Sequence, residues 1–165
     1  MTRAAETLAV FEDLGIVLRC ATIADVPAVV ALIAGGQIAG THDGIDSPAN
    51  LEQYEAAYRS IDADPAHLLV VAESIEGVVG TLQLSFIPGL ARRGSLRGQI
   101  EAVHVAATSR GAGIGSAMLG WAVDECRVRG CSLVQLTSNK NRLDAHRLYA
   151  KLGFEASHEG FKLAL

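Results

Sequence analysis

This chain of 165 residues lacks the features that mark several large classes of protein. It has no run of about 18 consecutive apolar residues, so nothing in it predicts a membrane-spanning helix. Its formal net charge of −4 gives no general electrostatic attraction to nucleic acid, so we expect no nucleic-acid partner. With 50% hydrophobic and 19% charged residues, the composition indicates one globular domain and excludes a disordered chain.

Cysteines are also few. Cys20, Cys126 and Cys131 are odd in number and lack the spacing of a metal site, so we expect no metal and no disulfide framework. Small buried thiols are typical of a reducing compartment.

Residues 1–15 lack the basic start and apolar middle of a signal peptide, which favours a cytoplasmic location. We expect this segment to be a loose arm or a short helix.

Hydrophobic periodicity predicts an alternation of strands and helices. Strands are expected at 16–21, 68–72, 78–87, 99–106 and 132–137, and a hairpin within 154–165. Helices are expected at 22–33, 49–61, 114–129 and 143–152. Strand–helix–strand steps imply parallel neighbours and hairpins imply antiparallel ones. The fold class is therefore α/β, with a mixed, twisted central sheet and helices on both faces. No repeat or linker divides residues 16–165, which we expect to form a single domain.

The most informative motif is Arg110-Gly111-Ala112-Gly113-Ile114-Gly115-Ser116, between a predicted strand and a predicted helix. A glycine-rich turn in that position leaves backbone N–H groups unpaired and free of side chains. The helix dipole adds partial positive charge at the same place. Together these features predict a phosphate-binding site.

Two common phosphate-binding motifs do not fit this turn. A P-loop needs a Lys followed by Ser or Thr directly after its last glycine, and no Lys is near. A dinucleotide fingerprint needs a glycine at its sixth place. That place holds Ser116 when counted from Gly111 and Met118 when counted from Gly113. Flavin and nicotinamide enzymes are therefore disfavoured.

The remaining pattern, Arg-Gly-x-Gly-x-Gly, resembles the pyrophosphate loop of the Gcn5-related N-acetyltransferase (GNAT) family. The order of predicted elements matches that family over residues 16–165, and the match is most specific over 100–154. The resemblance implies the acyl-CoA N-acyltransferase fold, with acetyl-CoA as the co-substrate. It leaves the oligomeric state open, with a homodimer as one alternative.

The resemblance also implies where the coenzyme lies. In the family, the strand before the glycine turn separates from the next parallel strand, and pantetheine amides pair with its open backbone, here at Val103 and Val105. Arg142 stands where many members have an Asn, with Asn141 beside it. A guanidinium there could reach a coenzyme phosphate or a substrate anion. The predicted coenzyme-binding residues are Val103, His104, Val105, Arg110, Gly111, Ala112, Gly113, Ile114, Gly115, Ser116, Asn141 and Arg142.

Glu101 is a carboxylate between apolar neighbours on this strand. It matches the place where many family members keep a Glu that takes a proton from the attacking amine. The alternatives are a surface carboxylate or one that orients the substrate. Strand alternation puts Glu101 on the same face as Val103 and Val105, and His104 on the other, unless a bulge intervenes.

Tyr149 lies in the pattern Leu-Tyr-x-x-x-Gly-Phe, which resembles the closing helix of the family. There a Tyr points to the thioester sulfur, and a phenol that donates a proton or hydrogen bond makes a thiolate leave more easily. The alternative for Tyr149 is a half-buried packing role.

We therefore expect an N-acetyltransferase that moves an acetyl group from acetyl-CoA to a primary amine of a small molecule or peptide by direct attack on the thioester. The alternative is a non-catalytic acyl-CoA-binding sensor or regulatory module. The acceptor is the open question. In the family the loop between the first two helices often lines the acceptor pocket, which makes His42, Asp43 and Asp46 candidate contacts.

Overall fold

The computed structural model describes residues 5–36 and 43–164. Its strands are β1 (Thr7–Phe11), β2 (Ile16–Cys20), β3 (His67–Ser74), β4 (Gly77–Pro88), β5 (Leu96–Val105) and β6 (Cys131–Leu136). Its α-helices are α1 (Val26–Gly35), α2 (Pro48–Ala63), α3 (Ala91–Gly94), α4 (Ile114–Val128) and α5 (Leu143–Lys151), with short 3-10 turns at Glu12–Leu14, Ile23–Asp25 and Ala107–Ser109. Within this part of the chain, each helix is too short or too polar to cross a membrane.

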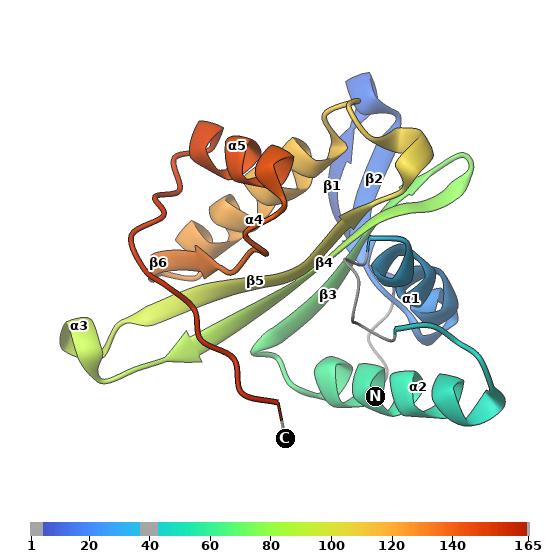
Figure 1. The fold of residues 1–165 in the computed structure, drawn as a ribbon, viewed down its shortest axis with the longest axis horizontal. Coiled ribbons are helices and arrows are strands. Elements are labelled where there is room, and N and C mark those ends of the chain that lie inside the picture. The colour runs from blue at the N-terminus through green and yellow to red at the C-terminus, as the bar shows by residue number, and fades with distance from the viewer. Residues whose placement is uncertain (1–4, 37–42, 165) are drawn as a thin grey trace.

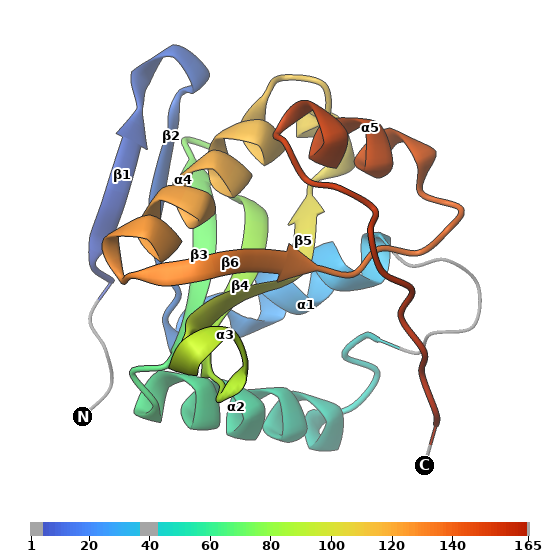
Figure 2. The same ribbon diagram turned by 90° about the vertical axis from the view of Figure 1, so that its left-hand side faces the viewer.

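The strands form one sheet in the order β1-β2-β3-β4-β5-β6. Every neighbouring pair is antiparallel except β5 and β6, which are parallel. Helices α1 and α2 cover one face of the sheet and α4 and α5 cover the other (Figures 1 and 2). The predicted mixed α/β architecture, with helices on both faces, is confirmed.

The larger hydrophobic core lies between the sheet and the α4/α5 layer. Helix α4 buries Ile114, Met118, Ala122 and Cys126, which recur every four residues and so form one face. These side chains pack on Leu18, Leu82, Leu84 and Ile100 of the sheet. Burial of apolar surface on this scale fixes α4, and with it the glycine turn that precedes it.

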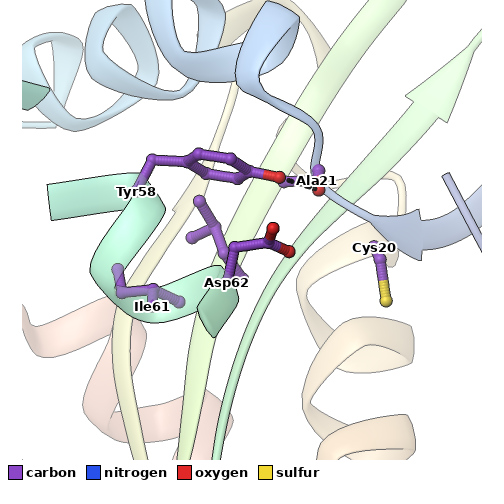
Figure 3. A pocket seen from close by; sticks show the side chains of 6 residues that line it. Cys20, Ala21, Tyr58, Ile61 and Asp62 are labelled. Carbon is purple, nitrogen blue, oxygen red and sulfur yellow. Dashed lines mark hydrogen bonds between the residues drawn. The ribbon is translucent and has the colours of Figure 1, made fainter. Parts of the chain in front are cut away.

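The second core lies beneath α1 and α2, around Val30, Tyr58 and Val71. The Tyr58 hydroxyl donates a hydrogen bond of 3.0 Å to the carbonyl oxygen of Ala21 and so ties α2 to the end of β2 (Figure 3). The cavity beside this pair has a volume of about 10 Å³, far below that of a ligand site. It is a packing feature of the fold.

An ion-pair cluster joins β2, β3 and the start of α1. Arg19 donates to both carboxylate oxygens of Asp25, at 2.7 and 2.8 Å, and to Glu73 at 2.8 Å. Asp25 also accepts hydrogen bonds from the backbone and side chain of Thr22, which closes a capping box. Burial opposes ionisation of Asp25, but the hydrogen bonds from Arg19 and Thr22 outweigh it, and the pKa of this carboxyl is lowered.

Both predictions for the ends of the chain are wrong. Thr7–Phe11 is strand β1, paired antiparallel with β2, instead of an arm or short helix. Residues 154–164 contain no strand, so the predicted C-terminal hairpin does not form there. Because no strand follows α5 in the described residues, α5 does not connect β6 to a further parallel strand there. Strand β5 also begins at Leu96, earlier than predicted.

Candidate active site

The glycine turn has the geometry that its sequence predicts. Gly111 and Gly113 have φ angles of +81° and +93°, a region in which a side chain is strained. Gly113 is the N-cap of α4, and no described side chain caps that helix. The first N–H groups of α4 therefore remain open at the positive end of the helix dipole. This end of α4 can hold an anion.

A groove runs beside this turn. Its volume is about 340 Å³, and it is lined by apolar residues of α1, including Ala31 and Leu32, and by the chain from Val105 to Ala107. The groove reaches Arg110, whose Nε donates a hydrogen bond of 3.2 Å to the carbonyl oxygen of Val105. A groove of this volume is large enough to hold part of an elongated ligand.

Strands β5 and β6 separate where the resemblance predicts that they do. Their described register runs from Leu96↔Cys131 to Ile100↔Leu136 and ends there. In the described residues, β5 from Glu101 onward pairs only with β4, so its other edge is open to a ligand, although the Val105 carbonyl oxygen already accepts a hydrogen bond from Arg110. Figure 2 shows β5 turning away from β6 beneath α5. Binding of a pantetheine amide at Val103 and Val105 stays a prediction.

A β-bulge in β5 overturns the predicted facing of its side chains. Gln83 pairs with Glu101 and Thr81 pairs with His104, so two steps along β4 oppose three steps along β5. Ala102, inside the bulge, has a φ of +50°, which is rare for a residue with a side chain. Because Thr81 and Gln83 share a face, Glu101 and His104 share it too.

That shared face is the one that α1 and α2 cover. Thr81 pairs with Val71, which belongs to the core beneath these helices. Val103 and Val105 pack against the opposite core. The expectation that Glu101 lies with Val103 and Val105, with His104 opposite, is therefore wrong. Two polar side chains three residues apart in an apolar strand were the available signal for a bulge.

His104 is held against the end of α1. A Cβ added to Gly36 would lie 2.7 Å from Cε1 of the imidazole and would clash more severely with Nδ1, so only glycine leaves room for the ring. Burial lowers the pKa of His104, and the positive charges of Arg142 and Arg110 lower it further, against a smaller opposing effect of Asp43. The imidazole is therefore neutral at pH 7 and can accept a proton.

Tyr149 lies on α5, half-buried against Phe154, with their ring centroids 6.2 Å apart. Burial raises the pKa of the Tyr149 hydroxyl, although the charge of Arg142 and the nearby Ser138 side chain oppose this effect. Ser138 Oγ is buried and completes no hydrogen bond within the described part of the chain. The phenol is thus protonated at neutral pH and able to donate.

A short turn before α5 positions Arg142. The Asn139 carbonyl oxygen accepts from the backbone N–H of Arg142 at 3.0 Å, and the Asn139 side chain accepts from that of Asn141 at 2.9 Å. The charge of Arg142 acts on both His104 and Tyr149, so its guanidinium lies within range of each. Among residues 5–36 and 43–164 it forms no ion pair. Arg147, by contrast, pairs with Asp144.

The structure thus places His104 and Tyr149 within electrostatic range of Arg142, and Glu101 on β5 directly after Ile100, the last residue that pairs with β6. Asp43 is near enough to His104 to affect its pKa, and it accepts a hydrogen bond from Tyr54 at 3.3 Å. His42 lies outside the described residues. In the described ranges, no group of three or more His, Cys, Asp or Glu side chains could hold a metal ion.

Comparison with known proteins gives two curated relatives. Over 68 residues the chain is 43% identical to aminoalkylphosphonate N-acetyltransferase of Salmonella typhimurium, a match that covers 41% of this chain and 44% of the relative. Over 88 residues it is 36% identical to glucosamine 6-phosphate N-acetyltransferase of Trypanosoma brucei brucei, covering 53% and 58%. The matches thus span about half the length of these relatives.

Among solved structures, one described as a transcriptional regulator from Bacillus halodurans C-125 is 38% identical, with a TM-score of 0.83, and the match covers 91% of this chain and 99% of that one. The family model of the acetyltransferase (GNAT) family matches residues 37–154, which include the glycine turn, the separated strands and Tyr149. On this match and this fold, the chain belongs to the acetyltransferase (GNAT) family.

Proposed function

We propose that this protein transfers the acetyl group of acetyl-CoA to a primary amine whose carrier also bears a phosphonate or phosphate group. The observation that carries the coenzyme assignment is the open α4 N-terminus at Gly113 beside the free backbone edge of β5. The first feature suits a pyrophosphate and the second suits the amides of pantetheine. The α4 N-terminus and the edge of β5 lie side by side, so one extended molecule could contact both.

Direct attack needs few protein groups. The amine nitrogen forms a bond to the thioester carbonyl carbon, and backbone N–H groups near Val103 and Val105 would stabilise the oxyanion. The C–S bond then breaks, and the electron pair leaves with sulfur. Tyr149, protonated and half-buried, would donate its proton or a hydrogen bond to that sulfur. Glu101, an exposed carboxylate on the acceptor side, would hold the ammonium form of the substrate or take its proton.

Arg142 supports an anionic acceptor. Its guanidinium acts on His104 and Tyr149, and no described carboxylate neutralises it. A guanidinium offers the fork of donors that binds phosphate and phosphonate well. Two relatives in this family carry an aminoalkylphosphonate or glucosamine 6-phosphate in their names, and both compounds combine an amine with such an anion.

The test is a panel of amines with acetyl-CoA, read as thiol release. The panel pairs aminomethylphosphonate with methylamine and glucosamine 6-phosphate with glucosamine, and adds a short peptide with a free N-terminus. We expect the phosphorus-bearing member of a pair to be the better substrate. Arg142→Gln should remove that preference at a cost of about 1.5–3 kcal/mol, roughly 10- to 150-fold in kcat/KM, while leaving acetyl-CoA affinity within about twofold.

Each alternative has its own result. Binding of acetyl-CoA without thiol release from any amine would favour the sensor or regulatory module. Equal rates within each pair, unchanged in Arg142→Gln, would contradict the anionic acceptor and leave the acetyl transfer standing. An equal loss of acetyl-CoA affinity and of rate in the variant would assign Arg142 to the coenzyme. Arg147→Gln is the matched control, because Arg147 already pairs with Asp144.

A further inference from the structure

The β-bulge in β5 has a chemical consequence, since it turns a second proton-accepting side chain to the acceptor side. Without the extra residue, His104 would face away from Glu101, as the alternation of a regular strand requires. With it, both side chains lie on the face covered by α1 and α2. The backbone of Ala102 adopts a φ of +50° to allow this, and such strain is often retained at functional sites.

We infer that His104 is the group that takes the proton from the acceptor amine, and that the bulge at Ala102 places it there. This inference rests on the proposed acetyl transfer and names the base for it. Glu101 then has the other role that its position allows, which is to attract and orient the ammonium group of the acceptor.

The location of His104 suits this role. It lies on β5 four residues beyond Ile100, the last residue that pairs with β6, and therefore beside the opening that would receive the thioester. Arg142 lies within electrostatic range of both His104 and Tyr149. A base on β5 and an acid on α5 thus flank the same opening, as proton removal from nitrogen and proton delivery to sulfur require.

The proton balance is simple. The substrate ammonium gives one proton to a ring nitrogen of neutral His104 and becomes a nucleophilic amine. Its lone pair forms the N–C bond, the C–S electron pair passes to sulfur, and the thiolate takes a proton from Tyr149, which then regains one from water. The nitrogen loses its second proton to solvent, and His104 returns its proton to solvent before the next turnover. No oxidant, metal or covalent enzyme intermediate takes part.

The charged groups that act on the ring keep it in the proton-accepting form. Arg142, before α5, and Arg110, in the glycine turn, both disfavour the imidazolium, and Asp43, before α2, favours it more weakly. Burial against Gly36 at the end of α1 also disfavours the charged ring. A general base is most effective when its pKa is near the operating pH, and imidazole is the side chain closest to this condition.

The decisive experiment is a pH–rate profile of kcat/KM for wild type and His104→Gln, with the fastest acceptor of the amine panel. We expect the wild-type profile to fall on the acid side with the pKa of His104, measured independently from the NMR titration of its ring in the free enzyme. The variant should lose about 10²–10⁴-fold in rate and lack that acid limb. Its acetyl-CoA affinity should stay within about twofold by calorimetry. His158→Gln is the control, because that ring is exposed and shares a hydrogen bond with the neighbouring Ser157 in the C-terminal segment.

A second variant tests the placement without removing the imidazole. Gly36→Ala puts a Cβ where the ring now lies, and because Gly36 has a φ of −102°, the backbone accepts alanine without strain. We expect a displaced ring and a rate at least about tenfold lower, again with intact acetyl-CoA binding. Gly120→Ala, in α4, is the matched control, since a Cβ there meets no atom within 4 Å.

The outcomes separate this inference from the proposed function. If wild type releases thiol with an acceptor and His104→Gln keeps both the rate and the acid limb, His104 is not the base, although the acetyl transfer stands. If Glu101→Gln instead removes the acid limb, the carboxylate is the base. If wild type binds acetyl-CoA but releases no thiol with any amine, the proposed function fails and this inference fails with it.

Discussion

At the residue scale, the proposed chemistry rests on three side chains around one opening. His104 is a neutral imidazole, Tyr149 is a protonated phenol and Arg142 is a guanidinium without an ion-pair partner in the described residues. Each group is in the form that its proposed role needs, because half-burial disfavours the charged forms of His and Tyr. Arg142 stays charged at any relevant pH.

Tyr149→Phe tests the proposed role of Tyr149 as the proton donor to sulfur. The substitution keeps the ring, whose centroid lies 6.2 Å from that of Phe154, and removes only the hydroxyl. We expect kcat to fall about 10–10³-fold while acetyl-CoA affinity changes by less than about threefold, because a proton donor acts in the transition state. Stopped-flow thiol release and calorimetry measure the two quantities. A variant that binds poorly but turns over at full rate once saturated would make Tyr149 a packing residue.

At the scale of elements, the ion-pair cluster that joins β2, β3 and the start of α1 contributes to the stability of the fold in acid. Arg19 is bidentate to Asp25 and also holds Glu73. The pKa values of both carboxyls are lowered, so the stability that they add is present above their ordinary pKa of about 4 and is lost as the pH falls through the folded-state values.

Asp25→Asn should therefore lower the free energy of unfolding at pH 7 by about 1–3 kcal/mol, the range for hydrogen bonds to a charged group. The difference from wild type should begin to shrink below about pH 4, where Asp25 of the unfolded chain takes up a proton, and should disappear as the pH falls through the lowered folded-state pKa. Urea unfolding at pH 7 and pH 3 measures both effects. Glu76→Gln, at an exposed turn, is the control. A difference that is the same at both pH values would mean that the ion pair is not its origin.

The elements also show which parts of the fold the sequence predicts. Local periodicity predicts α4, whose buried residues recur at helical spacing, and α5, whose half-buried residues do the same. It also predicts the glycine turn between β5 and α4. Strand β1 was missed because pairing with β2 stabilises it, and nothing local signals that partner. Residues 157–160 read as a turn, but a turn motif without a paired strand makes no hairpin.

The bulge explains why the site was predicted only in part. Alternation assigned Glu101 and His104 to opposite faces, and a single extra residue in β5 reverses that assignment. The backbone of Ala102 in the left-handed region is a tertiary effect, because alanine has no intrinsic preference for it. The turn residues could be predicted from sequence, whereas the shared facing of Glu101 and His104 could not.

At the scale of the whole molecule, the separation of β5 from β6 joins two faces of one sheet. The α4/α5 face supplies the glycine turn and Tyr149, and the α1/α2 face supplies Glu101 and His104. A donor held on one side would therefore meet an acceptor held on the other through the opening. This two-sided arrangement is what a direct transfer between two bound molecules requires.

The central claim is that the bare backbone amides at the start of α4 hold the pyrophosphate of acetyl-CoA. The most direct measurement is a calorimetric titration of acetyl-CoA into wild type, Gly113→Val and Ser116→Asp, each checked for its fold by thermal melting. Valine at a φ of +93° distorts the turn, whereas aspartate in the first turn favours the helix and repels the phosphates. We predict binding to wild type and affinity at least about tenfold lower in both variants. Absence of binding to folded wild type, or equal affinity in all three proteins, would contradict the account.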